Sequence, residues 1–177
     1  MIQIKNAAEL EKMRKACAIS AAALKAGGEA IEPGITTAEI DKIIYDFIVR
    51  HGARPNFLHR YGFPATACIS VNDTVIHGIP SRQQQIRPGD IVSIDTGCKI
   101  DGFNGDNACT YACGKIDLEA QRLLDVTKES LHRGIEMARG GNRVGDIGHA
   151  VQSYVEENGF SVVRSFVGHG VGKELHE

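Results

Sequence analysis

The chain has 177 residues, with 20 Lys and Arg against 22 Asp and Glu, so its formal net charge is −2. A hydrophobic fraction of 42% and a charged fraction of 24% exclude global disorder, and the length suits one domain. The near-neutral charge gives no electrostatic case for nucleic acid or an anionic membrane. Because the chain starts with a charged amphipathic stretch and has no long apolar run, we expect a cytoplasmic protein without a signal peptide.

The first 52 residues predict a pair of helices. Asn6 and Glu9 form a capping-box pattern before a helix over residues 7–26, which Gly27 and Gly28 are expected to end. The same pattern opens a second helix at Thr36, with an apolar stripe at helical spacing and a glycine at its end. Two helices joined by a Pro-Gly turn are therefore expected to precede the strands.

A second pair of helices is predicted near the end of the sequence. Asp117 caps a helix through Arg139, and a further helix runs from about Gly145 to Asn158. A shift of 107 positions superimposes this pair on the first. Although any two amphipathic helices can be aligned in this way, the shared order of helix, turn, helix and glycine favours an internal repeat. We expect one catalytic domain over residues 1–177, with a first repeat over 1–113 and an incomplete second over 114–177.

The segment between the helix pairs predicts strands. Residues 65–80 indicate a strand, a turn and a second apolar strand that runs into Gly78. Asp101-Gly102, between two alternating runs, is the strongest short-range signal for a hairpin with a two-residue turn. In that register Gly97 faces Asp106. One face is then apolar and carries the two cysteines of the hairpin, Cys98 and Cys109, which with Cys113 we interpret as core residues; all five cysteines of the chain are expected to be free thiols.

The other face of the hairpin carries two carboxylates. Asp95 and Asp106 are diagonal neighbours across the strands, with Cα atoms about 7–8 Å apart. Two neighbouring carboxyl groups resist ionisation unless a cation lies between them. If this face is exposed to solvent instead, the pair costs little and needs no cation. Histidines in Gly-rich turns, His77, His169 and His176, add a weak signal for a metal-dependent hydrolase. Two carboxylates and an imidazole are ligands typical of a site for Mn, Fe, Co or Zn. They do not indicate a zinc site built from thiolates.

Four motifs together carry a resemblance over essentially the whole chain. They are residues 70–80 (SVNDTVIHGIP), 87–95 (RPGDIVSID), 101–106 (DGFNGD) and 168–172 (GHGVG). With them the chain resembles the type I methionine aminopeptidases. The resemblance implies an α+β pita-bread fold, with pseudo-two-fold helix-helix-strand repeats around an antiparallel sheet and an incomplete second half. It also implies a hydrolase that removes the initiator methionine from nascent proteins.

The resemblance also implies roles for individual residues. Asp95 would ligate one of two divalent metal ions (Co, Mn, Fe or Zn), Asp106 would bridge both, and His169 would ligate the other. A bridging water would be the nucleophile. The catalytic histidines His77 and His176 would contact the scissile region of the substrate, and Cys68 and Phe63 would line the methionine pocket. The implied partners are nascent polypeptide N-termini, with the ribosome left open, and no membrane or direct nucleic-acid binding.

The chain departs from the family pattern in three ways. The family has two further glutamate ligands, one of them the usual general base, and residues 1–177 do not include them, so we expect impaired activity and self-association through an exposed face. Arg60 replaces a frequent pocket tyrosine, and Leu175 replaces a frequent aromatic residue. The alternatives are a related Xaa-Pro aminopeptidase, which the HGIP motif and the short N-terminus disfavour, and a non-catalytic pita-bread protein that binds peptides or ribosomes. Retention of all three metal-site residues disfavours the second.

Overall fold

The computed structural model describes residues 3–177, which form two compact units. One unit comprises the residues up to Ile116 together with His169–Glu177, and the other comprises Asp117–Gly168. The elements in chain order are α1 (Ala7–Glu29), α2 (Thr37–Arg50), β1 (Arg54–Pro55), the short 3₁₀ helix η1 (Arg60–Gly62), β2 (Ala67–Val71), β3 (Ile91–Ile100), β4 (Phe103–Ala112), α3 (Leu118–Met137) and α4 (Val144–Glu157). Within residues 3–177, no helix is both long and apolar enough to cross a bilayer.

Both helices of the first pair begin as the sequence predicts. The side chain of Asn6 accepts a hydrogen bond from the backbone N–H of Glu9, and Thr36 does the same for Glu39. In both cases the glutamate side chain returns a bond to the capping residue, which satisfies N–H groups that a helix start leaves unpaired. These local bonds fix where α1 and α2 enter the fold.

The prediction that Gly27 and Gly28 end the first helix is wrong. Helix α1 continues through both glycines to Glu29, and both are buried. A Cβ atom at Gly28 would lie 2.1 Å from the Tyr111 ring, and one at Gly27 would lie 2.7 Å from the Ile44 side chain. The two glycines therefore allow α2 and β4 to approach α1 closely, and here packing outweighs the low helix propensity of glycine.

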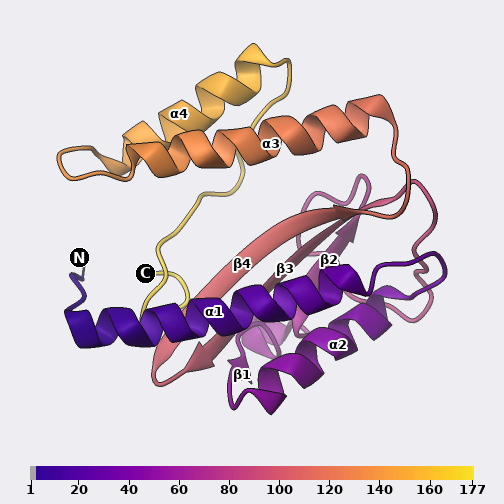
Figure 1. Cartoon of the computed structure of the whole chain (residues 1–177), viewed down its shortest axis with the longest axis horizontal. Helices are drawn as coiled ribbons and strands as arrows, with labels where there is room; N and C mark the ends of the chain where they lie inside the picture. Colours follow the sequence, from indigo (N-terminus) through magenta and orange to yellow (C-terminus); the bar gives the residue numbers. More distant parts are fainter. Residues whose placement is uncertain (1–2) are drawn as a thin grey trace. The chain divides into compact units, whose positions relative to one another are not determined.

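The sheet is built around β3, as Figure 1 shows. Strand β4 pairs antiparallel along one edge of β3, while β1 and β2 both pair with the other edge at different heights. The predicted hairpin register is confirmed, since Gly97 lies opposite Asp106 and Ile100 opposite Phe103. Helices α1 and α2 cover one face of this sheet (Figure 1), so the face with Asp95 and Asp106 is left free of them.

The predicted second strand between residues 74 and 80 is not formed. Asn72 and His77 both adopt positive φ angles, of 54° and 57°, which break an extended backbone. The segment instead folds back on β2, because Ile69 N–H donates to the Gly78 carbonyl and Gly78 N–H donates to the Ser70 hydroxyl. The apolar residues of this loop are largely exposed, so its hydrophobic pattern does not reflect burial in a sheet.

The core lies between the helices and the covered face of the sheet. Three isoleucines of α2 are fully buried, and they pack against residues of α1, β2 and β3. Full burial of such a side chain is worth about 1.5–3 kcal/mol. All five cysteines are free, as predicted, but Cys109 is exposed and is not a core residue, in contrast to Cys98 and Cys113. Its place on the outer strand β4, which pairs only with β3 within residues 3–177, explains the difference.

The second unit repeats the local structure of the first helix pair. Helix α4 coincides with α2 after a shift of 107 positions, and the predicted α3 start at Asp117 is confirmed, although α3 ends at Met137 instead of Arg139. Gly134 occupies the position equivalent to Gly27. A Cβ atom at Gly134 would lie 2.9 Å from the Val151 side chain, just as one at Gly27 would meet Ile44. The internal repeat therefore extends to the contact between the two helices.

Candidate active site

Two adjacent strands present a pair of carboxylates on the face of the sheet that the helices leave free. Asp95 pairs with Ala108 and Asp106 pairs with Gly97, so both carboxylates point to the same side of the hairpin. A Cβ atom at Gly97 would lie 3.0 Å from the Gly105 carbonyl oxygen. The glycine therefore allows Asn56 and Phe57 to pack closely over β3 next to Asp106, because a Cβ atom here would also lie 3.2 Å from Asn56 Nδ2 and 3.4 Å from the Phe57 ring.

The surroundings of this pair oppose a double negative charge. Burial raises the pKa of Asp95 to about 7, and the negative charge of Asp106 and a hydrogen bond to it act in the same direction. Burial also raises the pKa of Asp106, while the hydrogen bond with Asp95 opposes that rise, as does the charge of His169 or His176 whenever either ring is protonated. Without a cation, the two carboxylates therefore tend to share a proton.

The histidines reach the pair from the end of the chain. His169 Nε2 lies 3.8 Å from Asp106 Oδ2. The His169 and His176 rings contact each other edge to face, with 4.4 Å between their centroids. Partial desolvation lowers the pKa of His176, and the nearby positive charges of His169 and Arg60 add to that effect. His176 is therefore favoured in its neutral form, which can both donate and accept a hydrogen bond.

One buried amide ties the histidine segment to the hairpin. Asn104 Nδ2 donates to the carbonyl oxygens of Gly172 and Lys173, at 2.8 and 2.9 Å, and its backbone N–H also donates to Gly172. Lys99 Nζ donates to the same Lys173 carbonyl at 2.8 Å. Because Asn104 lies two residues before Asp106 on the same strand, these bonds fix the histidines relative to Asp106.

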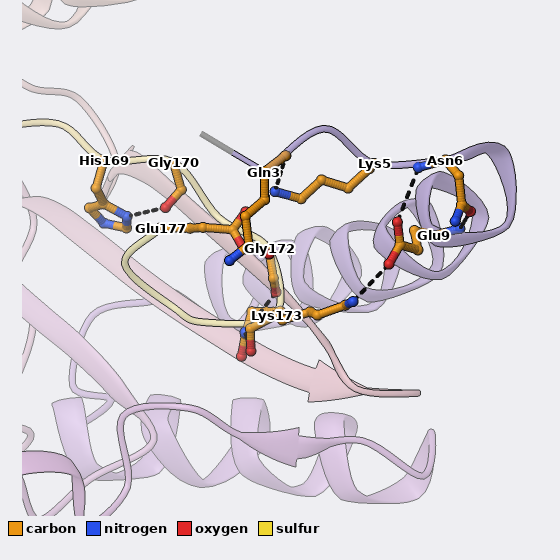
Figure 2. Close-up of polar contacts among 10 residues, drawn as sticks. Gln3, Lys5, Asn6, Glu9, His169, Gly170, Gly172, Lys173 and Glu177 are labelled. Carbon is orange, nitrogen blue, oxygen red and sulfur yellow. Dashed lines mark hydrogen bonds and ion pairs between the residues drawn. The ribbon is translucent and has the colours of Figure 1, made fainter. Parts of the chain in front are cut away.

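Ion pairs hold the same segment against the start of α1, as Figure 2 shows. Lys173 Nζ lies 2.8 Å from Glu9 Oε1, and Lys5 pairs with Glu177. Glu9 also accepts the Asn6 N–H in the capping box, so one carboxylate serves both contacts. The segment that carries both histidines is thus attached to the sheet on one side and to a helix end on the other.

All the site residues predicted from the sequence line one cavity of about 490 Å³. Cys68 enters from β2, Phe63 follows η1, and His77 comes from the loop after β2. Burial raises the pKa of the Cys68 thiol to about 12, and the neighbouring carboxylates, Asp95 first, add to the rise. Cys68 is therefore a neutral, soft wall of the cavity and not a thiolate ligand. The individual roles assigned to these residues stay predictions.

The donor chemistry of this cavity fits a divalent cation. Asp106 Oδ1 is buried without a hydrogen-bond partner, which is costly for a carboxylate oxygen unless a cation satisfies it. Carboxylate oxygens and an imidazole are ligands that Mn, Fe, Co and Zn accept. Within residues 3–177, however, no three His, Cys, Asp or Glu side chains lie close enough together to hold an ion by themselves. The residues present thus provide the correct donors but an open, incomplete set.

Sequence reasoning missed two residues that build this site. The partners of Asn104 lie 68 and 69 residues further along the chain, so no local pattern reveals them. Asp41 of α2 accepts hydrogen bonds from the backbone N–H groups of Thr66 and Ala67, at 2.9 and 2.8 Å, and so fixes the start of β2 next to Cys68. A polar residue one position after the buried Ile40 in a helix is the only signal that the sequence offers for it.

Comparison with known proteins agrees with this geometry. The family model for metallopeptidase family M24 matches residues 11–177. The chain belongs to metallopeptidase family M24. A methionine aminopeptidase of Clostridium perfringens is 51% identical over 177 residues, which are 100% of this chain and 71% of that protein. The M24 assignment confirms the predicted pita-bread α+β fold and a metal-dependent peptidase.

Solved structures of two enzymes resemble this chain to different degrees. The crystal structure of methionine aminopeptidase from Thermotoga maritima matches with a TM-score of 0.97 and 41% identity, covering 100% of this chain and 71% of that one. Prolidase from Pyrococcus furiosus matches with a TM-score of 0.85 and 25% identity, covering 98% of this chain and 50% of that one. The M24 fold is thus shared with both enzymes, while the sequence is more similar to the first.

Proposed function

We propose that this M24 chain is a methionine aminopeptidase, a hydrolase that removes the N-terminal initiator methionine from nascent proteins. The observation that carries the proposal is a single cavity that combines a carboxylate pair, three histidines and a soft, aromatic wall. The 51% identity to a methionine aminopeptidase over the full chain supports the same assignment. A thioether side chain packs well against aromatic rings and sulfur, so Phe63 and Cys68 suit methionine.

The expected cofactors are two divalent ions, with Co, Mn, Fe and Zn as the candidates. Asp95 and Asp106 would hold them together with His169, since these residues supply the hard oxygen and imidazole donors of the cavity. When bound, such ions supply Lewis-acid polarisation of the scissile carbonyl and an activated water. The unpartnered Asp106 Oδ1 supports Asp106 as the shared ligand.

The remaining residues of the cavity would bind and orient the peptide. His77 and His176 line the same cavity as Asp106, where each could donate a hydrogen bond to the scissile amide or to the oxyanion that forms from it. The lowered pKa of His176 favours a neutral imidazole for this task. Phe63 and Cys68 would bury the methionine side chain and exclude water from it.

We expect the 177-residue chain to have low activity. It spans 71% of the length of the relative from Clostridium perfringens, and the resemblance to the family implies two further glutamate ligands that residues 1–177 do not supply. Without their charge, metal affinity falls. Without a positioned general base, the rate falls by about 10²–10⁴-fold. Neighbouring residues can replace neither glutamate, because Asp95 and Asp106 are the only carboxylates that line the described cavity.

Partners and location follow from the same proposal. The substrates would be N-termini of nascent polypeptides in the cytoplasm, with the ribosome as a second partner. The charge balance of the chain gives no support for membrane or direct nucleic-acid binding. Self-association is supported by large apolar residues of α3 that are 58% exposed, Leu131 and Ile135.

A peptide assay tests the proposal. The chain is incubated with Met-Ala-Ser and with Gly-Ala-Ser in the presence of Co²⁺ or Mn²⁺, beside a chain extended with the C-terminal segment of its Clostridium perfringens relative. The proposal expects release of methionine, slow for the 177-residue chain and faster for the extended one, and little release of glycine. Cleavage of a third peptide, Gly-Pro-Ser, between glycine and proline, without release of methionine from Met-Ala-Ser, would support the Xaa-Pro alternative. No hydrolysis by either chain would favour a peptide- or ribosome-binding protein.

A further inference from the structure

A second cavity of about 470 Å³ adjoins the first one. It lies beside the loop from Arg54 to Arg60 and the hairpin, and it shares Arg60 and Leu175 with the methionine cavity. A peptide whose first residue occupies the first cavity can continue past Arg60 and Leu175 toward the second one. The second cavity is therefore within reach of the residues that follow the scissile bond.

The side chains of the second cavity carry an excess of positive charge. Arg54, Arg60 and Lys99 line it, and Glu174 is its only carboxylate. Within residues 3–177 none of these three cations forms an ion pair: Lys99 Nζ donates to a backbone carbonyl, and the Arg60 guanidinium lies 5.1 Å from the centre of the Tyr61 ring. Their charge is not neutralised by the part of the chain that the structure describes.

Two residues that line the cavity carry buried hydrogen-bond donors that lack acceptors. Four buried side-chain polar atoms of residues 3–177 have no partner, and two of them, Asn56 Nδ2 and Arg60 Nε, belong to residues that line this cavity. Both are N–H donors, and burial of such a donor without an acceptor is unfavourable. The other amide of the cavity, Asn104, already donates to two carbonyl oxygens. Two of the residues that line the cavity therefore carry a buried donor that an added acceptor could satisfy.

We propose that the second cavity is a carboxylate subsite, which binds an Asp or Glu side chain of the substrate downstream of the scissile bond. A carboxylate supplies several acceptor lone pairs and a negative charge, which match the two unpartnered donors and the three cations. Arg60, which lies in the wall between the cavities, links this preference to the methionine site. The inference rests on the proposed function for its substrate class, because it takes the ligand to be the same peptide.

Peptide binding to the metal-free protein tests the subsite independently of hydrolysis. Calorimetry in EDTA compares Met-Ala-Glu-Ser with Met-Ala-Gln-Ser, and Met-Ala-Ser-Glu with Met-Ala-Ser-Gln. We expect one glutamate peptide to bind about tenfold more tightly than its glutamine partner, as for a charge-assisted hydrogen bond, and the difference to shrink in high salt. Equal affinities within both pairs, or no binding of any peptide at millimolar concentration, would overturn the proposal.

Substitutions inside and outside the second cavity show which residues cause the preference for glutamate. Arg54→Gln and Arg60→Gln should each reduce the preference for glutamate, whereas Arg50→Gln, at the exposed end of α2 and outside the cavity, should leave it unchanged. Binding of inorganic phosphate without any preference between the peptides would show a general anion site and overturn the substrate assignment. If the glutamate preference persists while neither chain releases methionine, the proposed function fails and the subsite stands. If methionine is released equally from all four peptides, the proposed function stands and the subsite proposal fails.

Discussion

The two helix pairs have the same local structure but differ in what they bury. Helices α2 and α4 have the same length. Each is followed by an equivalent glycine with a positive φ angle, which is 72° at Gly52 and 79° at Gly159. Yet α2 buries three isoleucines and a threonine, whereas α4 buries only Val155. The difference follows from the strands, because a sheet packs against α1 and α2 inside their own unit. An amphipathic pattern therefore determines a helix, and the surrounding tertiary structure determines its stability.

The largest expected effect is the loss of a core side chain in the first pair. Ile44→Ala should destabilise the unit of α1 and α2 by about 2–5 kcal/mol, because Ile44 is fully buried between α1 and the sheet. The equivalent change in the second pair, Val151→Ala, should cost less, since Val151 is only partly buried. Urea denaturation, with hydrogen exchange to distinguish the two units, measures both. A larger cost for Val151→Ala would show that the comparison is wrong.

The helix pairs also show how much the sequence predicts. Capping residues, hairpin register and the shared face of Asp95 and Asp106 depend on near neighbours, so local patterns found them. The continuation of α1 through Gly28 depends on Tyr111, far along the chain, and no local rule anticipates it. The hydrogen bonds of Asn104 to the histidine segment were missed for the same reason. These two failures are thus contacts between distant segments, where packing overrides local propensity.

Gly105 in the first unit and Gly145 in the second differ in how closely other atoms approach them. Gly105→Ala should destabilise the first unit by about 1–3 kcal/mol, because its Cβ would lie 2.4 Å from the backbone carbonyl oxygen of Ala16 in α1. Gly145→Ala in α4 meets no atom within 4 Å, so it should stabilise the second unit by up to about 1 kcal/mol through helix propensity. Thermal denaturation of both variants checks the pair. Equal effects of the two changes would contradict the close approach of α1 to β4.

A third comparison concerns Asp41, whose equivalent in α4 is Gly148. Asp41→Ala leaves the backbone N–H groups of Thr66 and Ala67 without their acceptor and should cost about 1–3 kcal/mol. Asp41→Asn keeps an oxygen in place and should cost less. The half-exposed Asp46, which pairs with Lys42 one turn away, provides the control, and Asp46→Ala should cost at most about 0.5 kcal/mol. Similar losses for Asp41→Ala and Asp46→Ala would show that Asp41 does not anchor β2.

The metal-free first unit should also show a pH-dependent stability. The pKa of Asp95 is raised to about 7 in the folded protein, so the folded state binds this proton more tightly than the unfolded state does. The associated stability is fully present below the ordinary Asp pKa of about 4 and is lost as the pH rises through about 7. Urea denaturation in EDTA at several pH values measures the slope, which Asp95→Asn should flatten. An unchanged slope in that variant would show that Asp95 is not the group responsible.

The most direct test of the account is a calorimetric titration of the 177-residue chain with Co²⁺ and Mn²⁺. Asp106→Asn is compared with Asp101→Asn, a control from the turn of the same hairpin whose carboxylate pairs with Lys15 outside the cavity. We expect weak but measurable binding by the unaltered chain and by Asp101→Asn, and a loss of more than about tenfold in affinity for Asp106→Asn. Equal metal affinity of the three proteins would contradict the assignment of this cavity as the metal site.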